Sequence, residues 1–359
     1  MDYIIFGAQG IALGICKALQ TLNWNNKVLG FAVTKKEYNH ESLNNLPVLE
    51  LKRLRDFFRG KNWEKVEFLI ATPENVQPEI EESLEACGFL KYRRVPSEEY
   101  AAIMELYYAR NSSFYLLRPL AMGSRKSFLR SLVALSEVDK TLRSSAAYRV
   151  WMEPIQVGAT LGKRIIANLR DDMGENISYK NRNYSELTAL YWLWKNRLRR
   201  EGGDHIYYGL MQYRRRLMIS QDDLYRLEAN EVDVVLPYPM IYEPDITAHP
   251  KRYLREADWQ ALLTALREIQ PAYADAFPQI LDQPYFYNYN IILGRKPVLE
   301  AYCNWLFPVL ERVEELSEPK GKDRADRYIG YMGEMLETLY FMHNKKDLHI
   351  VHTGCKFYV

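Results

Sequence analysis

Arginines follow a predicted buried strand in the middle of the chain. Residues 205–211 are apolar and aromatic, as is typical of a buried strand, and Tyr213, Arg214, Arg215 and Arg216 come directly after its end. A guanidinium group is costly to bury without an anionic partner, and its rigid fork fits phosphate oxygens. In open α/β sheets, ligands bind beyond the carboxyl ends of the strands. These residues therefore predict a bound diphosphate, with ion pairs to surface carboxylates as the alternative.

A second candidate site lies at the amino end of the chain. Residues 2–6 form an apolar strand pattern, and Gly7, Gly10 and Gly14 lead from it into a helical pattern. Because a glycine turn at a helix N-terminus can hold an anion, these three glycines are a candidate nucleotide site. Their spacing differs from that of a dinucleotide-binding loop, and the next predicted strand, 28–33, ends in basic residues. A degenerate module for assembly or regulation is the alternative.

The composition excludes several classes of protein. Of 359 residues, 48 are Lys or Arg and 46 are Asp or Glu, so the net charge of +2 gives no reason to expect nucleic acid as a partner. The four cysteines are far apart, which predicts reduced thiols instead of disulfides or a zinc site. We find no long apolar run and no signal peptide. We expect a cytoplasmic protein, with basic segments such as 197–200 available for peripheral contact with the inner face of the plasma membrane.

The elements that must position these residues fall into two groups. Strands and helices alternate over the first hundred residues, which predicts a small parallel sheet. We place the domain boundary near residue 110, giving domains at 1–110 and 111–359. Around it we expect a helix at 98–110, a strand at 112–117 and a helix at 127–142. The predicted fold class is α/β in both domains.

The two halves resemble different known families. The first 95 residues, with the glycine turn and alternating elements, resemble the Rossmann-like domain in front of sugar-modifying enzymes of bacterial surface polysaccharide pathways. The second half carries the blocks IQVGA, DDMGENIS, RNYSELTALYWLWKN and YYGLMQYRR, followed by VDVVLP, NIIL, YCNWLF and GYMGEML. In this order they resemble a bacterial family of predicted glycosyltransferases, DUF4422, associated with capsule and exopolysaccharide synthesis. Members usually begin this domain with a strand ending in His-Lys-Pro, which is absent here.

This second resemblance implies a GT-A-like α/β fold, a nucleotide-diphosphate sugar as donor and a lipid-linked glycan as acceptor. Departure of the diphosphate needs cations or a divalent metal such as Mg or Mn, and both possibilities stay open. For the donor and its diphosphate we expect contacts from Lys163, Asp171, Asn176, Gly209, Tyr213, Arg214 and Arg215. For the acceptor and the sugar we expect contacts from Glu186, Tyr289 and Asn290.

Proton transfer and metal binding suggest further candidates. If the transfer inverts the anomeric centre, a carboxylate must accept the proton of the acceptor hydroxyl, and Glu334 and Asp172 are the candidates. An ion pair of Glu334 with Arg327 or Lys322 is the alternative. His352 loosely resembles a carboxy-terminal metal contact of some GT-A families. His349 is three residues away, on the opposite face of a predicted strand, and cannot share that metal.

Three functions are compatible with these residues. The first is transfer of a sugar to a glycan, as the resemblance implies. The second is a non-catalytic scaffold or regulator of polysaccharide assembly, favoured by the absent His-Lys-Pro and by the lack of an Asp-x-Asp triplet at the end of a convincing strand. The third is an NAD-dependent oxidoreductase, suggested by the glycine turn alone. The sequence selects neither the sugar nor the oligomeric state.

Overall fold

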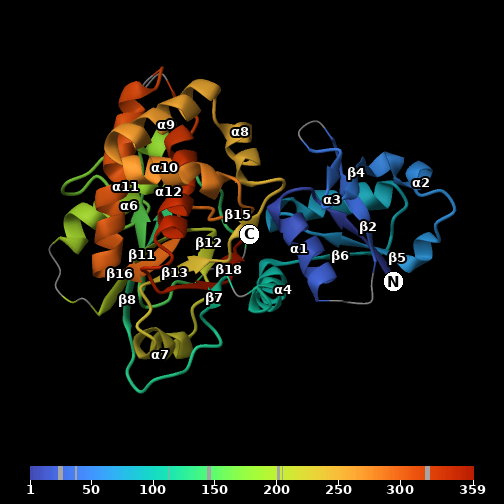
Figure 1. Ribbon diagram of the computed structural model, residues 1–359, viewed down its shortest axis with the longest axis horizontal. Coiled ribbons are helices and arrows are strands. Elements are labelled where there is room, and N and C mark those ends of the chain that lie inside the picture. Colours follow the sequence, from blue (N-terminus) through green and yellow to red (C-terminus); the bar gives the residue numbers. More distant parts are fainter. Residues whose placement is uncertain are drawn as a thin grey trace.

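The computed structural model describes residues 1–22, 27–36, 39–111, 113–143, 147–199, 203, 205–319 and 324–359. Two β-sheets with their own helices stand side by side, one built from the amino-terminal third of the chain and one from the remainder (Figure 1). Both sheets consist largely of parallel strands. The predicted α/β fold class is confirmed.

The amino-terminal sheet has the strand order β3-β4-β2-β1-β5-β6. Its strands are β1 (Asp2–Phe6), β2 (Val28–Val33), β3 (Ser42–Leu43), β4 (Leu46–Glu50), β5 (Val66–Ile70) and β6 (Tyr92–Arg94). Its helices are α1 (Gly10–Thr21), α2 (Leu54–Phe57), α3 (Gln77–Ala86) and α4 (Ser97–Ala109). The chain runs from β1 to β2 on one side and returns to β5 on the other side of β1. The carboxyl ends of β1 and β5 therefore form a topological switch point, where open α/β sheets bind ligands.

The larger sheet has the main strand order β10-β9-β8-β11-β16-β13-β17-β7. These strands are β7 (Tyr115–Leu116), β8 (Phe128–Leu135), β9 (Met152–Gln156), β10 (Leu169–Arg170), β11 (Ile206–Gln212), β13 (Val234–Pro237), β16 (Ile292–Arg295) and β17 (Ile350–Thr353). Strand β16 runs antiparallel to both neighbours. Strands β12 (Arg215–Leu217) and β18 (Cys355–Phe357) form a ribbon that continues from β11, and β14 (Met240–Ile241) pairs with β15 (Tyr285–Phe286).

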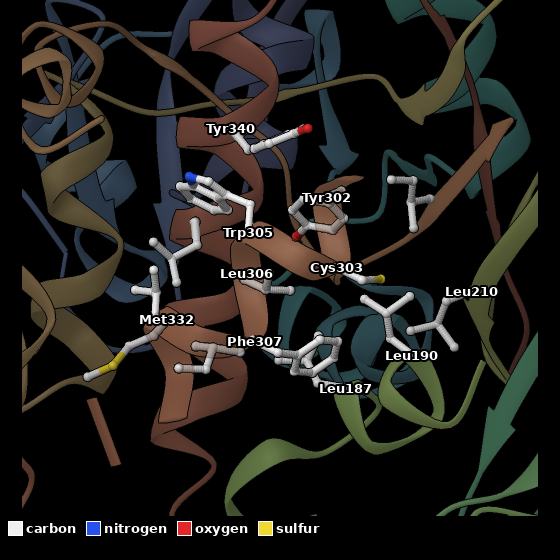
Figure 2. Packing of buried hydrophobic residues seen from close by; sticks show 14 of the residues in the cluster. Leu187, Leu190, Leu210, Tyr302, Cys303, Trp305, Leu306, Phe307, Met332 and Tyr340 are labelled. Atoms are coloured by element: carbon white, nitrogen blue, oxygen red, sulfur yellow. The ribbon is translucent and has the colours of Figure 1, made fainter. Parts of the chain in front are cut away.

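Alternation along β11 shows how the larger sheet is covered on both faces. Tyr208 and Leu210 face the main core, whereas Tyr207 and Met211 face a second cluster that includes Leu224 of α7 (Gln221–Ala229). Figure 2 shows part of the main core, where aromatic and aliphatic side chains interlock. The other helices of this domain are α5 (Asn181–Tyr184), α6 (Leu187–Leu193), α8 (Pro250–Tyr253), α9 (Glu256–Ile269), α10 (Pro271–Leu281), α11 (Lys296–Leu316) and α12 (Tyr328–His343).

The helix expected at residues 127–142 is wrong, because this segment forms strand β8. Its apolar spacing suits a helix, but β8 lies between β9 and β11, and both pair with it in parallel. A strand buried on both faces loses simple alternation, so periodicity cannot distinguish it from a helix. The strand expected at 112–117 is the short edge strand β7, and Ser112 lies outside the described residues.

The two domains contact each other through polar and apolar groups. Lys17 of α1 pairs with Glu243 at 2.8 Å, and the Tyr108 hydroxyl donates to the carbonyl of Pro239 at 2.7 Å. The carboxy-terminal strand β18 lies against α4, where the backbone N–H of Phe357 donates to Ser97 Oγ at 2.9 Å (Figure 1). These contacts fix the amino-terminal domain over the strand ends of its neighbour. Within the described ranges, no helix has the length and apolar character to cross a membrane.

Candidate active site

A cavity of about 390 Å³ lies between the facing edges of the two sheets. From the larger domain it is lined by Gln212, Arg215, Met240, Tyr242, His249, Arg252, Tyr253, Asn288, Tyr289, Arg327, Tyr331 and Glu334. From the smaller domain it is lined by Gly7, Ala8, Gln9, Gly10, Ile11, Ala71, Thr72 and Pro73. The structure thus brings the two regions singled out in the sequence, the glycine turn and the arginine-rich strand end, onto one cavity.

The three consecutive arginines point to three different environments. The Arg215 guanidinium lies 4.2 Å from the ring centre of Tyr289 and donates to Gln212 Oε1 at 3.3 Å, on the cavity wall. Arg216 is buried, donates to the carbonyls of Ala147 and Tyr213, and supports the chain locally. Because successive side chains of a strand alternate, the row of arginines separates instead of forming one cluster.

Arg214 belongs to the loops beyond the larger sheet. Its Nε is buried without a hydrogen-bond partner, and its guanidinium lies near the ring of Tyr213. Burial raises the pKa of the Asp139 carboxyl in the loop after β8, while the N–H of Ser136 and the charges of Arg214 and Arg327 lower it. The positive charge of two guanidinium groups thus reaches Asp139 at the carboxyl end of the central strands. Two guanidinium groups near one carboxylate leave a net positive charge, which suits an anionic ligand.

A buried amide and a buried carboxylate meet an exposed cation, Arg327, at the cavity wall. Asn290 is 2% exposed, and its Nδ2 donates to Glu186 Oε1 at 2.8 Å and to the carbonyl of Gly330 at 3.1 Å. Arg327 Nη2 lies 3.4 Å from Glu186 Oε2, while its Nε donates to Ser185 Oγ. Burial raises the pKa of Glu186, which Arg327 and Asn290 oppose. The structure therefore brings Glu186 and Asn290 together, and their role in binding the sugar stays a prediction.

Ser185 does not cap the helix that follows it. Its backbone has φ of 51°, and helix α6 begins without a side-chain cap. The hydroxyl instead accepts a hydrogen bond from Arg327, at 2.7 Å. The serine hydroxyl at position 185 therefore orients the Arg327 guanidinium group.

Glu334 is the carboxylate that reaches the cavity. It lies on α12, is 6% exposed, and has His249 Nε2 3.4 Å from its Oε2. Arg327 pairs with Glu186, not with Glu334, and Lys322 lies outside the described residues. Glu334 therefore remains the candidate for accepting a proton from a substrate hydroxyl.

The acidic turn has mainly internal partners. Asp171 is fully buried and accepts hydrogen bonds from the N–H groups of Gly158 and Ala159 and from the hydroxyls of Ser178 and Thr188. Asn176 bonds to backbone groups of the same turn. Their side chains thus support the loop after β9, and a direct contact with the donor stays a prediction for both residues.

Other predicted site residues lie away from the cavity lining. Asp172 pairs with Arg170 at 3.1 Å. Lys163 has an exposed side chain, and its backbone N–H bonds to Glu137. Tyr213 packs beside Arg214, and its backbone N–H bonds to the carbonyl of Ala134. Tyr289, in contrast, lines the cavity, with φ of +81°, and its contact with the acceptor stays a prediction.

Several glycines have a packing explanation. A Cβ on Gly209 would lie 2.3 Å from the Ile292 carbonyl oxygen, so the close neighbour is strand β16 and not a ligand. A Cβ on Gly10 would lie 2.8 Å from Met240 Cε, and one on Gly14 would lie 2.9 Å from the Tyr100 hydroxyl. The nucleotide-binding interpretation of Gly10 and Gly14 is therefore weakened. Gly7 has φ of +118°, which suits its place in the turn.

The metal contact proposed for His352 is wrong. Its Nδ1 faces the carbonyl of Tyr115 at 3.0 Å, and its Nε2 faces the Tyr287 hydroxyl at 2.8 Å. Burial lowers the pKa of His352 to about 4, so the ring is neutral. Both nitrogens are engaged, which leaves none for a metal ion. In the described part of the chain, no group of three or more His, Cys, Asp or Glu residues is placed to hold one.

Sequence reasoning missed several residues of this region. Asp139 was hidden in the segment expected to be helical, and Arg327 was considered only as a partner of Glu334. His249, Arg252 and Asn288 carry no motif, and they reach the cavity from different segments. The tyrosine-rich stretch around Asn288 was a usable signal, since its polar residues interrupt an aromatic run before a strand.

The fold and this site define a glycosyltransferase-like α/β domain preceded by a second α/β domain. Residues 140–345 match the model of a family described as a domain of unknown function, DUF4422. The match covers more than half of the chain, and the chain belongs to this family.

Among solved structures, the apo structure of the bifunctional glycosyltransferase WbbM is similar, with 26% sequence identity and a TM-score of 0.54. The similarity covers 64% of this chain and 45% of the WbbM chain, so the match spans less than half of that protein. No curated protein matches. The predicted relation to a glycosyltransferase-like family is confirmed.

Proposed function

We propose that this chain transfers a sugar from a nucleotide-diphosphate donor to a glycan acceptor in bacterial capsule or exopolysaccharide synthesis. The observation that carries the proposal is the position of Glu334, which shares a cavity wall with Arg215, Asn288 and Tyr289 at the carboxyl end of the central strands. A buried carboxylate beside cationic and aromatic side chains suits the activation of a sugar hydroxyl near a diphosphate.

The donor occupies the strand ends of the larger sheet in this proposal. Arg214 and Arg327, which both lie near Asp139, stabilise the negative charge of the departing diphosphate, and Arg215 supports it from the cavity side. The bond between the anomeric carbon and the phosphate oxygen breaks. The nucleoside diphosphate leaves with the bonding electrons.

The acceptor approaches from the cavity. For an inverting transfer, Glu334 accepts the proton of the acceptor hydroxyl while its oxygen forms the bond to the anomeric carbon. Asn290, held by Glu186, and Tyr289 position the sugar. Tyr253 and Tyr331 are stacked with ring centres 4.6 Å apart at the cavity wall, where they offer a flat apolar surface to a sugar ring. A lipid-linked acceptor places the enzyme at the inner face of the plasma membrane.

Thermal unfolding with UDP-, GDP- and dTDP-sugars and with NAD tests this proposal. We expect one class of nucleotide sugar to raise the melting temperature, and we expect Arg214→Gln to abolish that rise. Arg312→Gln is the matched control, because Arg312 is a surface residue of α11 paired with Glu268 and Glu315. Stabilisation by NAD alone contradicts the proposal. If none of these ligands raises the melting temperature, the result supports a non-catalytic scaffold instead.

A further inference from the structure

The smaller domain presents its own ligand-binding edge to the proposed acceptor cavity. The loops after β1 and β5 mark the switch point of the smaller sheet, and their residues Gly7–Ile11 and Ala71–Pro73 line the same cavity as Glu334. Each sheet thus contributes the edge at which α/β folds bind ligands. We propose that the two edges form one acceptor site, in which the smaller domain holds a phosphoryl group of the acceptor. This inference rests on the proposed function of the larger domain.

The electrostatics of the smaller domain's wall favour an anion. Helix α1 has 12 residues, no side-chain cap at Gln9 and no acidic residue in its first turn. The first N–H groups of a helix have no partner within it, and the helix dipole adds positive potential there. Because Gln9 and Gly10 line the cavity, this end of α1 is open to a ligand.

The opposite wall adds cations. Among the described residues that line the cavity, three guanidinium groups (Arg215, Arg252 and Arg327) face one carboxylate, that of Glu334. Arg327 is balanced by Glu186, and Arg215 serves the donor diphosphate in the proposed function. Arg252 forms no ion pair within the described ranges, so it is the cation left for the acceptor. Arg252 also lines an adjoining cavity of about 220 Å³ with Ala8, Gln9 and Gly10, so it lies across from the start of α1. A phosphoryl group between them gains charge-assisted hydrogen bonds.

An incompletely paired amide on the cavity wall suits a ligand that also carries a hydroxyl group. Asn288 is 7% exposed and lines the cavity, and its Oδ1 has no hydrogen-bond partner while its Nδ2 donates to the Tyr242 hydroxyl at 3.3 Å. A buried acceptor atom without a donor is costly, and a sugar hydroxyl would satisfy it. The cationic walls favour an anionic ligand, and the unpaired oxygen of Asn288 favours a ligand that donates from a hydroxyl. A sugar phosphate, or a sugar linked to a lipid diphosphate, has both groups.

The same geometry disfavours a dinucleotide at the glycine turn. Gly10 is covered by Met240 and Ile241 of β14, and Gly14 is covered by Tyr100 of α4. The end of β2 carries Lys35 and Lys36 where a dinucleotide site needs an acidic residue for the ribose. The open part of the turn is the side that faces Arg252.

A charge placed at the start of α1 tests the proposal. Gln9→Glu adds a carboxylate at the N-terminus of α1, where it stabilises the helix and repels a phosphoryl group. Arg252→Gln removes a cation from the other wall. Gln279→Glu is the matched control, because it adds the same charge at an exposed site of α10.

The binding of glucose, galactose and N-acetylglucosamine 1-phosphates, each against its methyl glycoside, is measured by calorimetry with the protein saturated by its nucleoside diphosphate. We expect wild type and Gln279→Glu to bind a sugar phosphate more tightly than the glycoside. We expect about tenfold weaker binding to Gln9→Glu and Arg252→Gln. The corresponding farnesyl-diphosphate-linked sugar separates a lipid-borne phosphate from a free one, since only the former gains affinity from the prenyl chain.

Equal binding of phosphates and glycosides, or unchanged affinity in both variants, overturns the inference. The nucleotide-sugar thermal shift is recorded on the same preparations. If that shift is present while the phosphate preference is absent, the proposed function stands and the two-domain acceptor site fails. If the shift itself is absent, the proposed function has failed first.

Discussion

The two sheets present their carboxyl ends to one cavity but equip them differently. The smaller sheet contributes backbone and small residues, from Gly7 to Ile11 and from Ala71 to Pro73. The larger sheet contributes cations, a carboxylate, amides and tyrosine rings. Backbone N–H groups can hold a fixed anion, whereas proton transfer needs an ionisable side chain. In our proposal the larger domain therefore supplies the chemistry, and the smaller domain positions the substrate.

Glycine usage sharpens this comparison. Gly209 of the larger sheet is required by the backbone of a neighbouring strand, but Gly10 of the smaller domain faces the end of a methionine side chain. An added side chain at Gly209 would thus meet rigid backbone in the larger domain. An added side chain at Gly10 would meet a flexible side chain at the junction between the domains. The following substitutions test the difference, beginning with the largest expected effect.

Replacing the proposed base gives the largest loss of activity. Glu334→Gln removes the proton acceptor but keeps a similar shape, so we expect kcat to fall about 10²–10⁴-fold with unchanged affinity for the nucleotide sugar. Asp172→Asn is the control, because Asp172 pairs with Arg170 away from the cavity lining, and we expect near-normal turnover. Steady-state kinetics and calorimetry measure the two effects. If kcat fell more in Asp172→Asn than in Glu334→Gln, Asp172 and not Glu334 would be the proton acceptor.

Adding one methyl group at Gly209 gives the largest loss of stability. The new Cβ would lie 2.3 Å from a backbone carbonyl of β16, which cannot move without disturbing the sheet. We expect Gly209→Ala to lower the free energy of unfolding by about 2–3 kcal/mol, measured by urea denaturation. Unchanged stability would show that the β11–β16 pairing differs from that described here.

The sequence predicted the main elements and part of the site. A buried strand followed by cations identified β11 and its arginines, because local spacing determines which faces are apolar. The divergence of Arg214, Arg215 and Arg216 depends on pairing between β12 and β18, which are far apart in the sequence. Asp139 was missed because its segment was expected to be a helix. Strand β8, which precedes it, can be recognised only from its pairing with β9 and β11. The shared cavity depends on domain packing, which no local pattern records.

A smaller effect concerns a carboxyl group behind the site. Glu337 of α12 is fully buried, and both its oxygens lack hydrogen-bond partners. Burial, followed by the charges of Glu334 and Glu186, raises its pKa well above the ordinary value of 4.5. The unfolded chain ionises near that ordinary value, so the stability that neutral Glu337 contributes is complete below it and is lost as pH rises toward the raised pKa.

Glu337→Gln should therefore flatten the decline of stability above pH 5. Glutamine stays neutral, so we expect the variant to exceed wild type at pH 8 by about 1.4 kcal/mol for each unit by which the pKa is raised. The free energy of unfolding from pH 4 to pH 8 measures this difference. Glu311→Gln, an exposed position on α11, is the control and should follow wild type. Parallel curves for Glu337→Gln and wild type would mean that Glu337 is already ionised in the folded protein.

The smallest effect is expected at the junction of the two domains. In Gly10→Ala the new Cβ would lie 2.8 Å from Met240 Cε, and this flexible chain end can move aside. We expect a change in the free energy of unfolding within about 1 kcal/mol, in contrast to Gly209→Ala. Gly10→Val cannot be accommodated in this way, and Met240→Ala should restore part of its loss because the two residues are in contact. Additive losses in the double variant would show that Gly10 does not pack on β14, which would remove the closed side of the glycine turn from the proposed acceptor site.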